Sequence, residues 1–218
     1  MSKKIILFPF GGNAREALQV IRDLNRIKKQ WDVVGFTDDD PSLWGKKFDG
    51  VKVLGGKDVL KKYREAYVLA VPGRANIYLK RKEIINGLKV PASRSATIIH
   101  PTVIVSNDAQ VGYNTLIMPY VMVSCGVKIG NHCVMLPQSV VSHDTQIGDY
   151  SCVGSNVSIS GFVHIKENCY VGSGAKIKED ITIEEKSLVG LGSVVIKDVP
   201  PGVTVAGNPA KILHLKNE

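Results

Sequence analysis

The adjacent residues His143 and Asp144 have the side-chain types best suited to catalysis in this 218-residue sequence. A neutral imidazole, with a reference pKa of about 6.5, can take a proton from an attacking amine or hydroxyl near neutral pH. A neighbouring carboxylate would hold the ring tautomer and favour the imidazolium that forms. The pair therefore suits general-base chemistry on such a nucleophile.

The other histidines and the cysteines offer weaker alternatives. The four cysteines contain no C-x-x-C pair, which argues against a zinc site or a redox pair. Cys133 and Cys169 belong to a series of mostly small residues in the repeat described below. Burial in the core explains their presence more simply than a role as nucleophile. A metal-dependent protein would need three histidines that converge on one ion. His132, His143 and His164 occupy different positions in the six-residue repeat that is described below, so the sequence does not place them together. We expect no metal, and we expect the remaining histidines at the surface or at corners: His100, His132, His164 and His214.

A second candidate site lies near the start of the chain. A short apolar strand is followed by Gly11-Gly12, a helix and a second strand that ends in Asp38 and Asp39, which is the layout of a nucleotide-binding crossover. Backbone amides at the helix start and the cation of Arg15 suit a phosphate, and the two acids suit a ribose or a base. The alternatives are a tight strand-to-helix turn and a solvated acidic turn, because the glycines do not form G-x-G-x-x-G.

The charge distribution divides the chain in two. Residues 1–96 hold 20 Lys and Arg against 10 Asp and Glu, whereas residues 97–218 hold 8 against 10. The basic first part suits an anionic partner or a solvated surface, but it lacks the interleaved aromatics expected for nucleic acid. In this part we expect strands over residues 5–8, 31–36, 51–54 and 67–71, and helices over 14–26, 57–63 and 76–86.

The second part repeats every six residues. An aliphatic series runs without insertion: Ile99, Val105, Val111, Ile117, Val123, Ile129, Met135, Val141, Ile147, Val153, Ile159, Ile165, Val171, Ile177, Ile183, Val189 and Val195. A second, mostly small or β-branched series lies two residues earlier, from Thr97 to Ser193. Both series share one strand face, so each repeat predicts one short strand and one turn, and three repeats predict a triangular coil. Nearly six stacked coils would be roughly 25–30 Å tall. Glycine follows the aliphatic residue at 112, 130, 148, 154, 172 and 190, where we expect it to accept turn dihedrals.

This pattern resembles the hexapeptide-repeat acyltransferases, whose trimeric left-handed parallel β-helix carries acetyl-coenzyme A. With the first part included, the chain looks like the sugar acetyltransferases of bacterial sialic acid, bacillosamine and perosamine pathways. The matching segments are Gly11-Gly12, Phe36-Thr37-Asp38-Asp39-Asp40, Ala70-Val71-Pro72-Gly73, Ile99-His100-Pro101, His143-Asp144 and Gly207-Asn208-Pro209-Ala210-Lys211. The resemblance implies an α/β nucleotide-binding-like domain over residues 1–92, followed by a left-handed parallel β-helix over 93–218. Because each coil covers only its neighbours, we also expect residues 199–215 to cap the far end.

The resemblance also implies roles for individual residues. In acyl transfer, His143 would be the general base and Asp144 its helper. The nucleotide-linked sugar would be faced by Asn13, Ala14, Arg15, Asp38, Asp39 and Gly73. Gly161 would offer a backbone donor near the acetyl group, and coenzyme A, lying between two subunits, would contact Cys152, Ser173 and Leu191. The chain departs from the family pattern at Cys152, where some members have a histidine, and at the first turn, Gly-Gly-Asn-Ala-Arg.

We therefore expect an acetyl-CoA-dependent enzyme that acetylates an amino group of a nucleotide-linked sugar for surface glycan biosynthesis. The alternatives are an O-acetyltransferase acting on sialic acid or another sugar hydroxyl, and a non-catalytic or metal-dependent hexapeptide protein. The expected assembly is a homotrimer. No apolar run reaches about 18 residues and no cleavage site follows the start, so we expect a cytoplasmic protein without membrane insertion or nucleic-acid binding.

Overall fold

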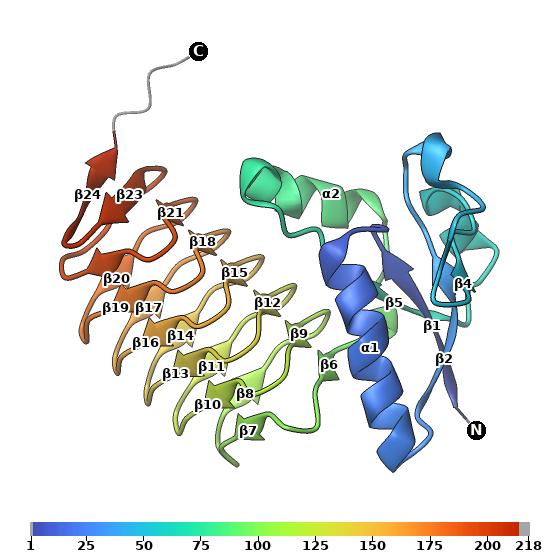
Figure 1. The fold of residues 1–218 in the computed structure, drawn as a ribbon, viewed down its shortest axis with the longest axis horizontal. Coiled ribbons are helices and arrows are strands. Elements are labelled where there is room, and N and C mark those ends of the chain that lie inside the picture. The colour runs from blue at the N-terminus through green and yellow to red at the C-terminus, as the bar shows by residue number, and fades with distance from the viewer. Residues whose placement is uncertain (1, 214–218) are drawn as a thin grey trace.

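The computed structural model describes residues 2–213, so His214 and the last residue of the expected cap lie outside the described residues. The chain begins with a parallel sheet of three strands in the order β2-β1-β5, with β1 (Lys3–Phe8), β2 (Trp31–Phe36) and β5 (Tyr67–Ala70). Helix α1 (Gly12–Ile27) connects the first two strands and lies between this sheet and the rest of the molecule (Figure 1). The central strand begins with the exposed residues Lys3 and Lys4 and then becomes apolar and buried, because Ile5, Ile6 and Leu7 have no exposed surface.

Short elements complete the N-terminal part. They are the 3-10 helices η1 (Pro41–Leu43), η2 (Lys57–Lys61), η3 (Ala75–Lys80) and η4 (Ala92–Arg94), the hairpin of β3 (Lys47–Phe48) with β4 (Val51–Lys52), and helix α2 (Arg81–Gly87). The strand expected over 31–36 is confirmed at both ends. The helices expected over 57–63 and 76–86 are present in a tighter form, since the first is a 3-10 helix and the second changes from 3-10 to α at Arg81.

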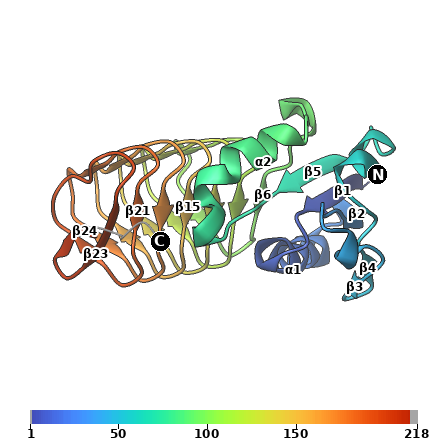
Figure 2. The same ribbon diagram turned by 90° about the horizontal axis from the view of Figure 1, so that it is seen from above.

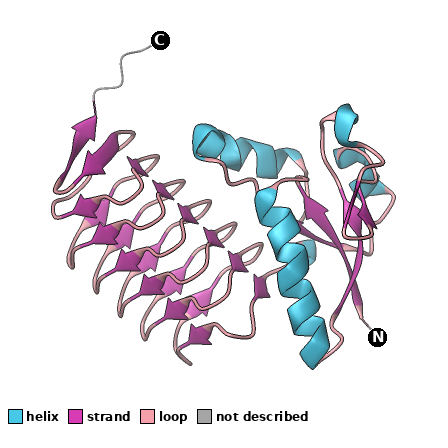
Figure 3. Ribbon diagram, viewed as in Figure 1, coloured by secondary structure: helices cyan, strands magenta, loops and turns pink. Residues whose placement is uncertain are grey.

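Residues 98–195 form a left-handed parallel β-helix of about six coils (Figures 1 and 3). Each coil contributes one two-residue strand to each of three parallel sheets, which we call the first, second and third face. The first face contains β6 (Ile98–Ile99), β9 (Leu116–Ile117), β12 (Val134–Met135), β15 (Cys152–Val153), β18 (Tyr170–Val171) and β21 (Leu188–Val189). The second contains β7 (Ile104–Val105), β10 (Met122–Val123), β13 (Val140–Val141), β16 (Ser158–Ile159), β19 (Lys176–Ile177) and β22 (Val194–Val195). The third contains β8 (Gln110–Val111), β11 (Lys128–Ile129), β14 (Gln146–Ile147), β17 (His164–Ile165) and β20 (Thr182–Ile183).

The six-residue pattern is confirmed strand by strand, because the aliphatic residue of every repeat is the second residue of its strand. From Ile117 to Val195 these side chains are buried in one column inside the prism. A hairpin of β23 (Thr204–Gly207) and β24 (Ala210–Leu213) closes the first face at the far end. No helix within residues 2–213 is long and apolar enough to cross a membrane.

Hydroxyl side chains of the small-residue series tie successive coils together. Ser139 donates to the carbonyl of Gly154 (2.7 Å) and accepts from the Val157 N–H (3.1 Å). Thr145 likewise donates to the carbonyl of Ser160, 15 residues later, and accepts from the Val163 N–H, 18 residues later. Both of these hydroxyls therefore have a donor and an acceptor partner, which removes the cost of burying an unpaired polar group.

The expectation that the glycines after the aliphatic residues accept turn dihedrals is wrong. Positive φ angles recur three residues after the aliphatic one, mostly at residues other than glycine: Asn114, Tyr120, Gly126, His132, Gln138, Asp144, Tyr150, Asn156, Phe162, Asn168, Gly174, Asp180, Lys186 and Gly192. The glycines at the earlier position are required by close packing of coils. A Cβ on Gly154 would lie 2.4 Å from the Ser173 backbone nitrogen, and one on Gly172 would lie 2.6 Å from that of Leu191.

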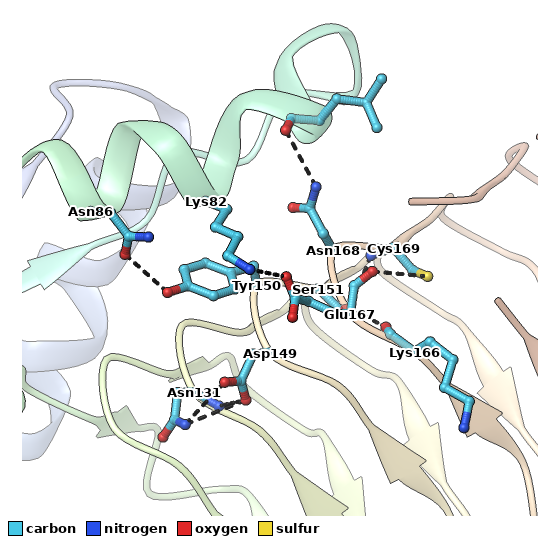
Figure 4. Close-up of polar contacts among 11 residues, drawn as sticks. Lys82, Asn86, Asn131, Asp149, Tyr150, Ser151, Lys166, Glu167, Asn168 and Cys169 are labelled. Carbon is cyan, nitrogen blue, oxygen red and sulfur yellow. Dashed lines mark hydrogen bonds and ion pairs between the residues drawn. The ribbon is translucent and has the colours of Figure 1, made fainter. Parts of the chain in front are cut away.

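The N-terminal part packs on the first face and along one edge of the prism. We call the turns between the first and second faces the first corner, those between the second and third faces the second corner, and those between the third and first faces the third corner. Ile98, Leu116 and Val134 point outward from the first face into one apolar cluster with α1 and the sheet. Figure 2 shows α2 running over the coils. Its contacts, on Tyr150, Glu167 and neighbouring residues, lie at the third corner (Figure 4).

Arg81 fixes α2 to two successive coils. Its side chain is fully buried and donates to the carbonyl oxygens of Tyr150 (2.9 Å) and His132. Those two residues are 18 positions apart and therefore stack at the third corner. The N-terminal part is thus held on the side of the prism opposite the second corner.

Candidate functional site

His143 and Asp144 form a hydrogen-bonded pair at the second corner, in the turn between β13 and β14. His143 Nδ1 lies 3.0 Å from Asp144 Oδ2, and both side chains are about half exposed. Asp144 adopts φ +58°, a left-handed conformation that Asp tolerates better than most residues. Its backbone N–H donates to the carbonyl of Cys125, one coil earlier, at 3.0 Å. Because a carboxylate can only accept, this contact suits the neutral tautomer in which Nδ1 donates, and that tautomer leaves the lone pair of Nε2 free.

The imidazole of His143 rests on Gly161, which lies 18 residues later in the next coil. A Cβ on Gly161 would be 2.5 Å from His143 Cε1 and 2.8 Å from Nε2, so only glycine leaves room for the ring. The Phe162 ring meets the imidazole edge-on, with 5.1 Å between ring centroids. The position of the ring is therefore set by Asp144 beside it, Gly161 beneath it and Phe162 at its edge.

The residues expected to face a nucleotide gather at the carboxyl ends of β1, β2 and β5. The Asn13 side chain donates to the carbonyl of Val71 (3.2 Å), and a Cβ on Gly73 would lie 2.1 Å from Asn13 Nδ2. Arg15 is held over the rings of Phe10 and Phe48, with its guanidinium carbon 5.8 and 5.5 Å from the ring centroids.

Ala14 differs from the others because its side chain is buried against the sheet, 1% exposed. Only its backbone is left to meet a ligand, at the first turn of α1.

The two acids at the end of β2 hold the surrounding loops in place. Asp38 accepts from the N–H of Phe10 through Oδ2 and from that of Asp40 through Oδ1, both at 2.9 Å. Asp39 accepts from the N–H of Lys57 at 2.9 Å. Each carboxylate oxygen has more than one lone pair, so these bonds leave capacity for a ligand. Asp38 thus joins the β1–α1 loop to the turn that follows β2.

The residues expected to contact coenzyme A lie in two environments. Ser173 and Leu191 stack at the first corner, 18 residues apart; Leu191 is 82% exposed, and Ser173 accepts from the Ser155 N–H (3.1 Å). Cys152 is 4% exposed and packs in the apolar cluster between the first face and the N-terminal part. Burial raises the pKa of its thiol, which keeps it protonated. Contact of coenzyme A with Cys152 stays a prediction of the resemblance.

One chain does not bring all of these residues together. His143 lies at the second corner, on the side of the prism opposite the first face. The N-terminal sheet, whose loops contain Asp38 and Gly73, packs on that first face. The three histidines of the metal-dependent alternative are also separated, because His132 lies at the third corner, His143 at the second and His164 on the third face. Among residues 2–213, no group of three His, Cys, Asp or Glu side chains could hold a metal ion within one chain.

Sequence reasoning missed a buried polar cluster at the third corner. His132 is 7% exposed, stacks on Tyr150 with centroids 4.6 Å apart, and lies 2.9 Å from the side-chain nitrogen of Asn114 through Nδ1. Burial lowers the pKa of His132 from 6.5 to about 4, so the ring is neutral. His100 is likewise buried, next to Asp23 of α1. No pattern within the repeat distinguishes these histidines, because their burial comes from α1 and α2.

Sequence reasoning also missed an apolar strip on the second face. The outward-facing first residues of three consecutive strands are apolar and exposed: Ile104 (65%), Met122 (42%) and Val140 (37%). Tyr120 (65%) and Phe162 (49%) lie at the corners that border this face. The corresponding positions on the third face are Gln110, Lys128 and Gln146. This contrast is visible in the sequence once the repeats are sorted by face.

The fold and the repeat define a hexapeptide-repeat protein with a left-handed β-helix and an N-terminal sheet packed on its side. Residues 94–200 match the family described as the GMPPB C-terminal domain. No curated protein matches the sequence.

The similar solved structures include a perosamine N-acetyltransferase and an acetyltransferase domain. Perosamine N-acetyltransferase from Caulobacter crescentus, in complex with CoA and GDP-perosamine, is 24% identical, with a TM-score of 0.84 over 98% of this chain and 97% of that chain. The acetyltransferase domain of PglB from Neisseria gonorrhoeae FA1090, in complex with acetyl coenzyme A, is 24% identical, with a TM-score of 0.84 over 98% and 100%. WeeI from Acinetobacter baumannii AYE is 27% identical, with a TM-score of 0.81 over 98% and 100%. The shared fold therefore includes the N-terminal sheet as well as the β-helix.

Proposed function

We propose that this protein transfers the acetyl group of acetyl-CoA to the amino group of a nucleotide-linked sugar. The observation that carries this proposal is the His143–Asp144 hydrogen bond at an exposed corner of the solenoid. It occurs on a fold shared, end to end, with an enzyme whose structure contains CoA and GDP-perosamine. That enzyme was also crystallised as variants in which one histidine is replaced by Asn or Ala.

The proposed mechanism uses His143 as the only proton-transferring side chain. The substrate nitrogen attacks the thioester carbonyl carbon, and His143 Nε2 takes a proton from that nitrogen. The C–S bond then breaks, and the imidazolium returns the proton to the coenzyme A thiolate. Asp144 stabilises the imidazolium between these steps and holds Nδ1 as the donor, while the Gly161 backbone N–H would face the oxyanion.

We assign the two substrates to two parts of the chain. Residues 1–92 form the proposed nucleotide-sugar domain, in which Asn13, Arg15 and the N-terminal amides of α1 face the phosphates, and Asp39 faces the ribose. Residues 93–218 form the proposed acetyltransferase domain. Coenzyme A would lie along the first corner, against Ser173 and Leu191.

A homotrimer is part of the proposal, because one chain separates its own two substrate sites. The strip of Ile104, Met122 and Val140 on the second face would be covered by a second copy, which removes about 25 cal/mol of unfavourable free energy per Å² of apolar surface. Packing three prisms with closed symmetry would place the second corner of one copy next to the first face of another. We also propose a cytoplasmic location.

A screen with acetyl-CoA tests the function. Purified protein is incubated with GDP-linked and UDP-linked amino sugars, with their hydroxyl counterparts and with sialic acid, and thiol release is followed. We expect turnover with an amino sugar nucleotide, and we expect His143→Ala to lower this turnover by about 10²–10⁴-fold. Turnover only with sialic acid or a hydroxyl sugar would replace this proposal by O-acetylation. Unchanged turnover in His143→Ala would place the base elsewhere.

A further inference from the structure

Trp44 is an exposed aromatic residue at the edge of the N-terminal sheet where the acids of β2 lie. Its side chain is 49% exposed, although tryptophan is usually well covered in a folded domain. The indole is nevertheless fixed in place, because its Nε1–H donates to the carbonyl oxygen of Asp38 at 2.8 Å. The other tryptophan of the chain, Trp31, is 8% exposed in the core.

The neighbours of Trp44 cover about half of its surface. Its six-membered ring lies against Gly56, where an added Cβ would be 3.4 Å from Trp44 Cζ2 and 3.3 Å from Asp39 Oδ1. The indole and the carboxylate of Asp39 therefore border the same glycine. Lys57, whose backbone N–H donates to Asp39, follows directly. A rigid aromatic surface, an acid and a cation thus lie next to one another at the carboxyl end of β2.

We propose that Trp44 is the surface on which the base of the nucleotide-linked sugar stacks. This inference rests on the proposed function and names a specificity-determining residue for it. In a β-α-β nucleotide-binding unit, the acid at the end of the second strand faces the ribose, so the base extends past that acid. At that place this chain has the indole of Trp44. Its hydrogen bond to Asp38 holds it in position before a ligand arrives, which lowers the entropic cost of stacking.

In this proposal the stacking partner is the purine or pyrimidine ring of the nucleotide. An indole surface is indifferent to the hydrogen-bonding pattern of the base, so it contributes affinity in proportion to ring overlap. A purine has a larger ring system than a pyrimidine and gains more. The structure therefore favours a guanine or adenine nucleotide over a uracil nucleotide as the carrier of the sugar.

Intrinsic fluorescence gives a direct test, because the chain has only two tryptophans. The full-length protein is titrated with GDP and with UDP, and emission is recorded together with calorimetric binding. We expect GDP to quench the emission in the wild type and in Trp31→Phe, and to leave Trp44→Phe unquenched. Quenching that persists in Trp44→Phe would overturn the inference.

Affinity measurements separate stacking from a structural role. Trp44→Phe keeps an aromatic ring and should retain most of the GDP affinity, whereas Trp44→Leu keeps apolar bulk and should lose it by roughly 5- to 100-fold. The affinity for coenzyme A should not change in either variant. Ile27→Ala is the matched surface control, because Ile27 is 73% exposed at the far end of α1.

The outcomes distinguish this inference from the function on which it rests. If GDP binds equally well to Trp44→Leu and to the wild type, the stacking role is wrong and the acetyltransferase proposal stands. If neither nucleotide binds the wild-type protein while acetyl-CoA does, the nucleotide-sugar proposal itself fails. A loss in Trp44→Leu that Trp44→Phe does not rescue would indicate a structural role and also overturn the inference.

Discussion

Gly161→Ala tests whether the geometry of the second corner controls the reaction. The added Cβ would lie 2.5 Å from His143 Cε1, whereas carbon atoms in contact are about 3.5–4.0 Å apart. The imidazole, which is half exposed, would have to move outward by about 1 Å. Such a displacement of a catalytic group costs on the order of 10²-fold in rate. We therefore expect kcat to fall by about 10²-fold with little change in KM.

Thiol release from acetyl-CoA measures this loss, and the melting temperature checks that the coil is intact. Gly87→Ala is the matched control, because a Cβ at Gly87 meets no atom within 4 Å. A double-mutant cycle adds the decisive comparison. If Gly161→Ala acts by displacing the base, it should cost little more once His143 is already Ala. Wild-type turnover in Gly161→Ala, or an equally large loss in the His143→Ala background, would refute the reasoning.

Four further predictions address the other parts of the site. Asp144→Asn keeps the side-chain shape and tolerates the left-handed turn, so it should lower kcat less than His143→Ala does in the same thiol assay. Asp38→Ala removes the bond to the Phe10 N–H and should weaken nucleotide-sugar binding while leaving coenzyme A affinity unchanged by calorimetry; equal loss of both would contradict two separate sites. Met122→Glu places a charge on the apolar strip and should shift the sedimentation of the proposed trimer toward monomer, with loss of activity. His132 has a pKa of about 4 in the fold, below its ordinary 6.5, so the unfolded chain binds the proton first as the pH falls. Its contribution, on the order of 2–3 kcal/mol, should be present above about pH 6.5 and be lost toward pH 4, and His132→Gln should flatten this part of the stability-against-pH curve relative to the wild type.

The β-helix was predictable because its pattern is local. Each aliphatic residue from Ile99 to Val195 is in the strand that the six-residue step assigns to it. The role of the glycines was not predictable, because it depends on backbone atoms 18 residues away. Gly154 and Gly172 look like turn glycines in the sequence, and only stacking of the next coil shows why a side chain is excluded.

The candidate site was predictable where its parts are adjacent in the chain. His143 and Asp144 are neighbours, and the left-handed turn at Asp144 brings their side chains into contact. The bonds from Phe10 and Asp40 to Asp38 join segments whose proximity only the folded sheet creates. Arg81 is a stronger case, because a buried cation bonded to two carbonyls on successive coils resembles a surface arginine in sequence.

The position of the His143 ring depends on Gly161, so these two residues, 18 positions apart, have to be considered together. Because the coils have the same length, the residue beneath the His143 ring is the one a full coil later, and at that position only glycine leaves room for the ring. An insertion or deletion of a single residue between them would move the glycine out of the column and put a side chain under the ring. Gain or loss of a whole 18-residue coil elsewhere would leave the pair intact. The spacing of His143 and Gly161 is therefore a search pattern for this kind of site in other hexapeptide chains, defined by coil length and not by neighbouring residues.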